Sequence, residues 1–145
     1  MQGDLMKRPE ALDEEIFFDG KSLISETDLK GNIIYVNRKF VEMSGYSKQE
    51  SLDQPHNILR HPDMPKEAFK GMWKTIQAGN IWEGYVKNLR KDGKYYWVIV
   101  NIIPKKDEEG IIIGYIASRK VPDRNRIDAV EIQYAQMLLK ENKEA

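Results

Sequence analysis

The segment from Arg60 to Pro65 holds side chains of three different chemistries at short spacing. Arg60, His61 and Asp63 supply a cation, an imidazole and a carboxylate, and Pro62 and Pro65 restrict the backbone around them. Pro65 then leads into a segment with the periodicity of a helix. A short rigid loop of this kind can present several hydrogen-bonding groups to a ligand while the next helix supplies an apolar wall. The segment therefore predicts a binding site rather than a catalytic one.

The composition predicts one folded domain with terminal extensions. The 145 residues are 41% hydrophobic and 10% aromatic, which is enough for a packed core. The 23 basic and 23 acidic residues cancel, so no net charge attracts the chain to nucleic acid. The chain has no cysteine, which excludes disulfides, thiolate metal sites and a cysteinyl adduct to a cofactor. Any redox function therefore needs a bound cofactor.

Membrane insertion is not expected for this chain. Its apolar runs, such as 97–100 and 111–113, fall far short of the ~20 residues that cross a bilayer, and the amino terminus lacks a hydrophobic signal core. We therefore expect a cytoplasmic protein without a membrane span. A partner, or a further part of a longer protein, could still hold it at the inner face of the membrane.

Three sections follow one another along the sequence. Residues 1–20 predict an N-terminal cap in which Phe17 and Phe18 dock on other residues. Residues 21–121 predict the folded domain, and residues 122–145 a C-terminal amphipathic helix. The helix is expected because its apolar residues recur at intervals of three and four: Ile127, Val130, Tyr134, Met137 and Leu138.

The folded section should contain five strands and several helices. Short helices are expected from residue 37 to about residue 59, and a longer helix between Pro65 and Gly79 carries Trp73 on its apolar face. Short turns around Gly93 and Gly110 imply that the last three strands form an antiparallel meander. The predicted strands span residues 23–27, 32–36, 81–89, 94–104 and 111–120.

This order of elements, together with two sequence motifs, resembles a PAS domain. The general motifs are Gly45-Tyr46-Ser47 followed by Glu50, and Lys91-Asp92-Gly93 followed by Tyr96-Trp97. A longer and more specific match resembles the PAS domain of the Aer aerotaxis and energy-taxis receptor family. It comprises residues 54–65, Phe69, Met72, Trp73, Trp82 and residues 86–88.

The resemblance implies an α+β PAS fold, with a five-stranded antiparallel sheet and several short helices on one side. It also implies noncovalent binding of FAD, without catalysis or a metal site, and transmission of the flavin's redox state to a chemotaxis transducer. A homodimer through the terminal helices is a further expected contact. The site residues that the resemblance implies are Arg60, His61, Asp63 and Trp73, with Asn37 and Asn88 as weaker transfers.

The residue types are consistent with such a site. Trp73 could wall an aromatic slot, and Arg60 could engage phosphate through its planar guanidinium. Asp63 is better suited to orienting Arg60 or His61, or to binding a ribose hydroxyl, because a carboxylate repels phosphate. His61 could contact the cofactor, titrate near neutral pH or simply face solvent. The structural alternatives are a core position for Trp73 and a surface ion pair for Arg60 and Asp63.

Two other functions remain open from the sequence. A haem-binding PAS oxygen sensor would need an axial ligand, for which His56 and His61 are the available imidazoles. A ligand-free PAS interaction module would leave the loop at Arg60 unexplained. A blue-light sensor of the LOV type is excluded because its flavin adduct requires a cysteine. No motif for an enzyme is present, and FMN in place of FAD stays open.

Overall fold

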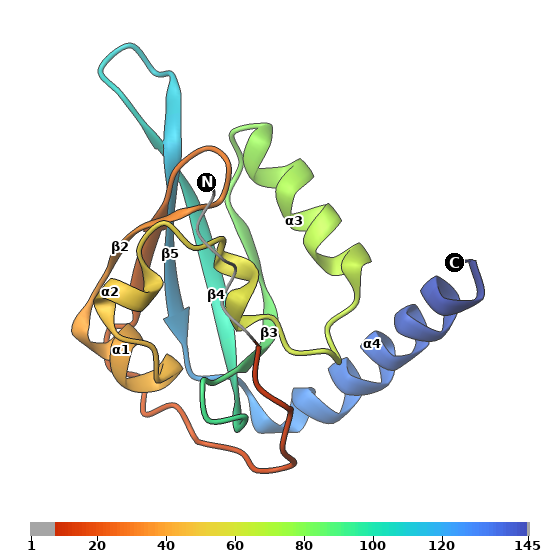
Figure 1. Ribbon diagram of the computed structural model, residues 1–145. Helices are drawn as coiled ribbons and strands as arrows, with labels where there is room; N and C mark the ends of the chain where they lie inside the picture. Colours follow the sequence, from red (N-terminus) through yellow and green to blue (C-terminus); the bar gives the residue numbers. More distant parts are fainter. Residues whose placement is uncertain (1–7, 145) are drawn as a thin grey trace, which may run out of the picture.

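A computed structural model describes residues 8–144. It shows that this part of the protein folds around a five-stranded antiparallel sheet (Figure 1). Residues 1–7 of the predicted cap and residue 145 lie outside the described part. The strands follow the spatial order β2-β1-β5-β4-β3. Their bounds are β1 (Ile24–Thr27), β2 (Ile33–Val36), β3 (Trp82–Leu89), β4 (Tyr95–Lys106) and β5 (Ile112–Lys120). The predicted α+β fold with five antiparallel strands is therefore confirmed.

Short helices and one longer helix cover one face of the sheet. The chain enters this layer after β2 and leaves it before β3, so the helices connect the two edge strands. Buried side chains of these helices pack on the side chains of alternate strand positions, such as Val98, Val100 and Ile102. The elements of this layer are α1 (Arg38–Ser44), α2 (Lys48–Ser51), the 3₁₀ helix η1 (His56–Leu59) and α3 (Lys66–Gln77).

Local capping explains where the short helices begin and end. The side chain of Asn37 accepts the backbone N–H of Phe40 and so caps α1, which stops at Gly45 in the left-handed conformation (φ 79°). Ser47 and Glu50 form a reciprocal capping box at the start of α2. Such closely spaced caps break the segment into short turns, and these turns place η1 beside the strands.

The N-terminal segment lies along the free edge of β4 beyond the end of β5. The backbone N–H of Leu12 donates to Gly93, and that of Ile16 donates to Tyr95, each at 2.8 Å. Phe18 is buried, whereas Phe17 is exposed beneath the guanidinium of Arg124, whose carbon lies 4.5 Å from the ring centroid. Only one of the two phenylalanines therefore docks on the core.

Helix α4 (Arg124–Glu144) follows β5 (Figure 1), and near its far end Glu141 contacts the start of α3. The apolar positions predicted for its inner face are all buried or half-buried. Tyr134 donates its hydroxyl to the carbonyl of Tyr85 at 2.6 Å and stacks on Trp97. The Glu141 carboxylate accepts the backbone N–H groups of Lys66 and Glu67. α3 has no side-chain cap of its own, so α4 supplies that cap.

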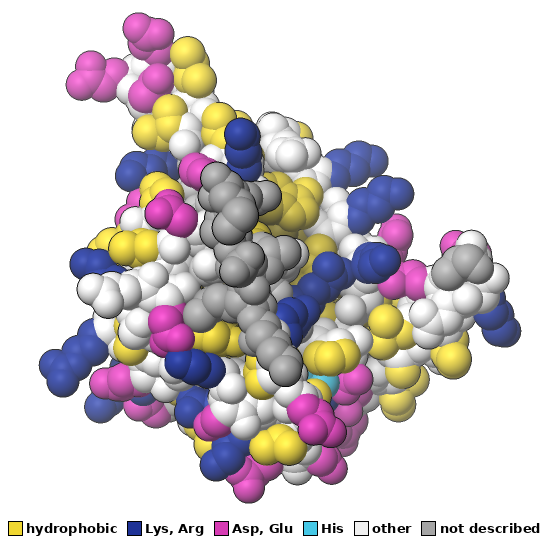
Figure 2. Space-filling model, in the orientation of Figure 1, with side chains coloured by type: hydrophobic (Ala, Val, Ile, Leu, Met, Phe, Trp, Pro, Cys, Tyr) yellow, Lys and Arg dark blue, Asp and Glu magenta, His cyan; other side chains and the backbone are white. Residues whose placement is uncertain are grey.

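Acidic and basic side chains alternate on the face shown in Figure 2. No single sign of charge dominates that face, as the equal numbers of acidic and basic residues suggest. Within residues 8–144, no helix is long and apolar enough to span a bilayer.

Candidate ligand-binding site

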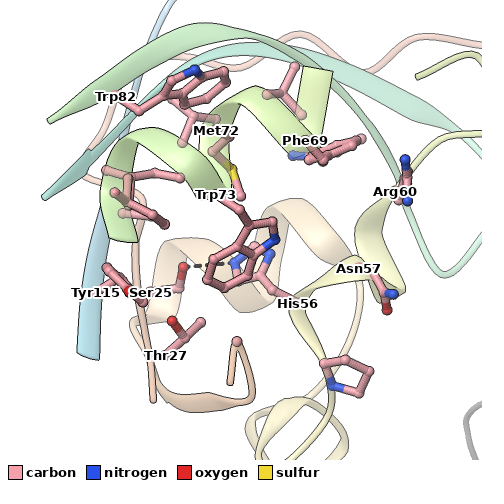
Figure 3. A pocket seen from close by; sticks show the side chains of 18 of the residues that line it. Ser25, Thr27, His56, Asn57, Arg60, Phe69, Met72, Trp73, Trp82 and Tyr115 are labelled. Atoms are coloured by element: carbon pink, nitrogen blue, oxygen red, sulfur yellow. Dashed lines mark hydrogen bonds between the residues drawn. The ribbon is translucent and has the colours of Figure 1, made fainter. Parts of the chain in front are cut away.

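A cavity of about 320 Å³ lies between the sheet and the helical layer, and we call it the main cavity (Figure 3). α3 contributes an apolar wall through Phe69, Met72, Trp73 and Ile76. The opposite wall comes from inward-facing strand positions and from the segment around η1. A volume near 300 Å³ is at the lower end of the range for small-molecule sites. The cavity can therefore enclose a ring system but not a whole dinucleotide.

Trp73 reaches from α3 into the cavity toward His56 and Ser25 (Figure 3). Its indole meets Tyr115 edge to face, with ring centroids 5.7 Å apart, and lies against the backbone of Gly31. A Cβ at Gly31 would lie 2.9 Å from the indole, and the φ of +87° also favours glycine. The close approach of this turn therefore depends on a residue without a side chain.

Three polar residues form a hydrogen-bonded cluster in the cavity wall, which we call the inner cluster: Ser25, His56 and Arg119. Ser25 Oγ lies 3.0 Å from His56 Nε2, and Arg119 donates to both Ser25 Oγ (2.9 Å) and His56 Nε2 (3.1 Å). A guanidinium only donates, so His56 Nε2 must be an acceptor, and a neutral His56 carries its proton on Nδ1.

The inner cluster carries an unbalanced positive charge. Arg119 is 7% exposed, and within residues 8–144 no carboxylate lies within ion-pair distance of it. Burial lowers the pKa of Arg119 to about 10, so it stays protonated at neutral pH. Burial and the nearby Arg119 charge lower the pKa of His56 to about 3, so the imidazole stays neutral. A buried cation thus lines an otherwise largely apolar cavity.

Arg60, Trp73 and Asn88 are the predicted site residues that line this cavity. The Arg60 guanidinium carbon lies 4.4 Å from the ring centroid of Phe69, and burial lowers the pKa of Arg60. Asn88 is 5% exposed, and its backbone forms an antiparallel bridge with that of Arg60. The structure thus brings the cation of the loop and the amide of β3 to the same wall.

His61 and Asp63 are not among the residues that line the main cavity. The buried His61 accepts the backbone N–H of Asp63 on Nδ1 at 3.0 Å. The Asp63 carboxylate lies 2.8 Å from Lys87 Nζ. Burial and the Lys87 charge lower the pKa of His61 to about 4, although Asp63 opposes that fall. We call His61, Asp63 and Lys87 the outer cluster.

Asn37 also lies outside the residues that line the cavity. Its side-chain oxygen accepts the backbone N–H groups of Phe40 (3.0 Å) and Ile24 (3.2 Å), and its nitrogen donates to the Ser22 carbonyl (2.9 Å). These bonds join the start of α1 to the start of β1. Asn37 therefore positions backbone, and its polar atoms are engaged away from the cavity.

The sequence analysis did not identify Ser25 or Arg119, and it considered His56 only as a haem ligand. One signal could have indicated Arg119. Alternate residues of β5 face the core, and Arg119 follows Tyr115 and Ala117 in that alternation. A charged residue at an inward-facing strand position is rare unless it is paired or functional. Among the described residues, no group of three or more side chains is arranged to hold a metal ion.

Comparison with known proteins defines the class of this domain. A family model described as "PAS fold" matches residues 33–119, so the chain belongs to the PAS family. The "Aerotaxis receptor" of Escherichia coli (strain K12) is 48% identical over 116 residues, which cover 80% of this chain and 23% of that receptor. Within the family, the chain is a PAS domain of the aerotaxis-receptor type, which confirms the resemblance drawn from the sequence motifs.

More distant relatives share the same domain. The "Nitrogen fixation regulatory protein" of Klebsiella oxytoca is 35% identical over 97 residues, which cover 67% of this chain and 20% of that protein. The chain thus spans less than a quarter of these two curated relatives. The light-state structure of the blue-light photoreceptor Aureochrome1 LOV superposes with a TM-score of 0.66 at 22% identity, covering 83% of this chain and 91% of that one. At that identity the likeness shows the fold alone.

Proposed function

We propose that this PAS sensor domain binds FAD noncovalently in the main cavity and transmits the redox state of the flavin to a chemotaxis transducer. The sensor class follows from the family, and the relation to an aerotaxis receptor supports the signal and the partner. FAD, when bound, supplies electron acceptance that the cysteine-free chain does not provide. The chain itself binds, orients and electrostatically tunes the ring.

The unbalanced charge of Arg119 is the observation that carries the proposal. A buried guanidinium without a carboxylate is costly, and it favours a ligand that brings electron-rich oxygen or negative charge into the cavity. The carbonyl edge of an isoalloxazine meets that need, and reduction increases the negative charge on the ring. Arg119 should therefore stabilise the reduced form more than the oxidised form and raise the midpoint potential.

The other cavity residues suit the remaining parts of FAD. Trp73 and the apolar side chains of α3 provide a slot for a flat ring, and Asn88 offers an amide that can both donate and accept. The cavity volume is too small for the whole dinucleotide, so the phosphates belong near its exposed rim. The half-buried Arg60 and the exposed Lys30 both line the cavity and can supply cations for them.

The position of Arg119 suggests how a charge change leaves the cavity. Its guanidinium holds Ser25 of β1, His56 of η1 and the carbonyl of Ala117 on its own strand. A change in its attraction to the ring would therefore act on two strands and one helix at once. Transmission to a transducer, and a homodimer through the terminal helices, remain parts of the proposal that need a partner to test.

A haem sensor finds less support from the same geometry. His56 Nε2 already accepts from Arg119, and His61 is not among the residues that line the main cavity. A buried arginine beside an axial histidine would also repel the iron cation. A ligand-free interaction module is the second alternative, and it leaves the cost of burying Arg119 without a compensating function.

Reconstitution of the purified chain with FAD, FMN, riboflavin or haem tests the proposal. We expect FAD to bind with quenched flavin fluorescence and to give a flavin absorption spectrum at one equivalent per chain. A preparation that binds none of the flavins would overturn the proposal, and a Soret band would establish the haem alternative.

A pair of arginine variants tests where the phosphates bind. Arg60→Met should weaken FAD binding and leave riboflavin binding unchanged, because riboflavin has no phosphate. Arg38→Met is the matched control, since the Arg38 side chain is 95% exposed on α1. An equal loss of affinity for both flavins in Arg60→Met would assign Arg60 to the ring instead.

A further inference from the structure

The loop after η1 is joined to β3 by a set of contacts outside the main cavity. Asp63 Oδ2 lies 2.8 Å from Lys87 Nζ, and the backbone N–H of Lys87 donates to the sulfur of Met64 at 3.4 Å. The backbone of Arg60 forms an antiparallel bridge with that of Asn88. We call these contacts between residues 60–64 and residues 87–88 the seam.

The side chains of the seam point to two different sides of the sheet. Successive residues of a strand face opposite sides, so Lys87 faces away from the cavity that Val86 and Asn88 line. Asp63 and Lys87 instead line a second cavity of about 200 Å³ beneath α4. The ion pair therefore lies behind the cavity wall that Arg60 and Asn88 form.

Lys87 depends on Asp63 for its charge balance. The Lys87 side chain is 11% exposed, and Asp63 is the one carboxylate within 4 Å of its ammonium among residues 8–144. The ammonium also lies 4.3 Å from the ring centroid of Tyr95. Without the carboxylate, a nearly buried ammonium would be unpaired and would move toward solvent. That movement would pull on the strand at the position next to Asn88.

His61 fixes the loop in the conformation that makes this pairing possible. Its Nδ1 accepts the backbone N–H of Asp63 at 3.0 Å, and its ring meets that of Tyr95 with centroids 5.9 Å apart. Tyr95 thus contacts both the imidazole of His61 and the ammonium of Lys87. The loop and β3 therefore both contact the ring of Tyr95.

We infer that Lys87 is a positioning residue for the ligand cavity, and that Asp63 and His61 act on ligand binding through this seam rather than by touching the ligand. The inference rests on the proposed function for the identity of the ligand. It assigns the loop two separate tasks: Arg60 faces the ligand, and the residues after it fix the place of Arg60 and Asn88.

A double-mutant cycle on FAD affinity tests the inference, with Asp63→Asn, Lys87→Met and both together. Asp63→Asn alone should weaken FAD binding by about tenfold, because it leaves the ammonium unpaired. In the Lys87→Met background the same change should alter Kd by less than about twofold, because no charge remains to be balanced. Equal losses in both backgrounds would mean that Asp63 contacts the ligand itself, and the inference would fail.

A measurement on the ligand-free chain keeps the test independent of FAD. Backbone amide NMR shifts of Arg60 and Asn88 should change in Asp63→Asn. They should stay in place in the control Glu50→Gln, which removes the charge of another carboxylate paired with a lysine, Lys91, away from the cavity. Unchanged shifts at both residues in folded Asp63→Asn would refute the seam. Failure of the unaltered chain to bind FAD would refute only the proposed function.

Discussion

The two histidines of this chain lie in clusters that look alike and differ in charge balance. His56 and His61 each have a cation nearby and a lowered pKa. The inner cluster around His56 contains Arg119 and no carboxylate, whereas the outer cluster around His61 contains Asp63 beside Lys87. The inner cluster faces the main cavity, and the outer cluster does not. A cluster that balances its own charge stabilises the fold, and an unbalanced one leaves its charge for a ligand.

Replacement of Arg119 should produce the largest contrast between the clusters. Arg119→Met should weaken FAD binding by roughly ten- to a hundredfold, because a hydrogen bond to a charged group is worth ~1.5–3 kcal/mol. The ligand-free chain should be as stable as before or more stable, since an apolar side chain of similar length removes the cost of burying a charge. Fluorescence titration and thermal melts measure the two effects.

The matched variant in the outer cluster is Asp63→Asn, which should lower the stability of the ligand-free chain. A destabilised Arg119→Met chain that keeps its FAD affinity would abolish the distinction between the clusters. If enough FAD remains bound to Arg119→Met, its midpoint potential should fall by about 30 mV or more, the equivalent of a tenfold change for a two-electron couple.

Acid should destabilise the fold through both histidines. Their pKa values in the folded chain, about 3 for His56 and about 4 for His61, lie below the unfolded value near 6.5. Between these values the unfolded chain binds more protons, so stability is highest above pH 6.5 and is lost as the pH falls. His56 alone should account for about 2 kcal/mol of loss between pH 7 and pH 5, measured by urea unfolding.

Histidine variants separate the two contributions to this acid sensitivity. His56→Gln should flatten the pH profile, because an amide oxygen can accept from Arg119 without titrating. His61→Gln should flatten it equally down to about pH 5 and less below that, since the neighbouring Asp63 favours protonation of His61 and its pKa in the folded chain is the higher of the two. A larger effect from His61 than from His56 below pH 5 would reverse the order of the two pKa values.

The smallest effect is expected from a carboxylate that belongs to neither cluster. Glu141→Gln keeps one side-chain oxygen that can accept a backbone N–H at the N-terminus of α3. It loses the second oxygen and the negative charge, so the N–H groups of Lys66 and Glu67 are no longer both accepted by a carboxylate. The melting temperature should fall by about 2–4 °C, the size expected for a weakened cap. Glu144→Gln, an exposed position on the same helix, is the control. An equal fall in both variants would mean that the cap contributes nothing specific.

Local sequence patterns predicted most of the fold. All five strands are present within two residues of their predicted ends, because turns such as that at Gly93 are encoded locally. The capping residues around α1 and α2 acted as their positions suggest. Asn37, which the resemblance suggested for the ligand site, is one of these caps. A polar residue before a helix satisfies the nearest backbone N–H groups first.

The composition of the cavity was harder to predict because it depends on tertiary pairing. Ser25 and Arg119 are 94 residues apart in the sequence, and they meet because their strands, β1 and β5, are paired. The loop at Arg60 gave the opposite difficulty. Its residues are adjacent in sequence, which suggested one shared target, but Arg60 lines the cavity and Asp63 binds a lysine on the other side of the sheet.

The cap that Glu141 provides also couples the cavity energetically to the last helix, beside the contacts that Tyr134 makes with β3 and β4. α4 holds the start of the helix that carries Trp73. By thermodynamic reciprocity, the factor by which this attachment strengthens ligand binding equals the factor by which the ligand strengthens the attachment. A partner that draws α4 away must work against that same free energy. The ratio of FAD Kd values between Glu141→Gln and the unaltered chain therefore measures how much the cap contributes to the coupling between ligand binding and the attachment of α4.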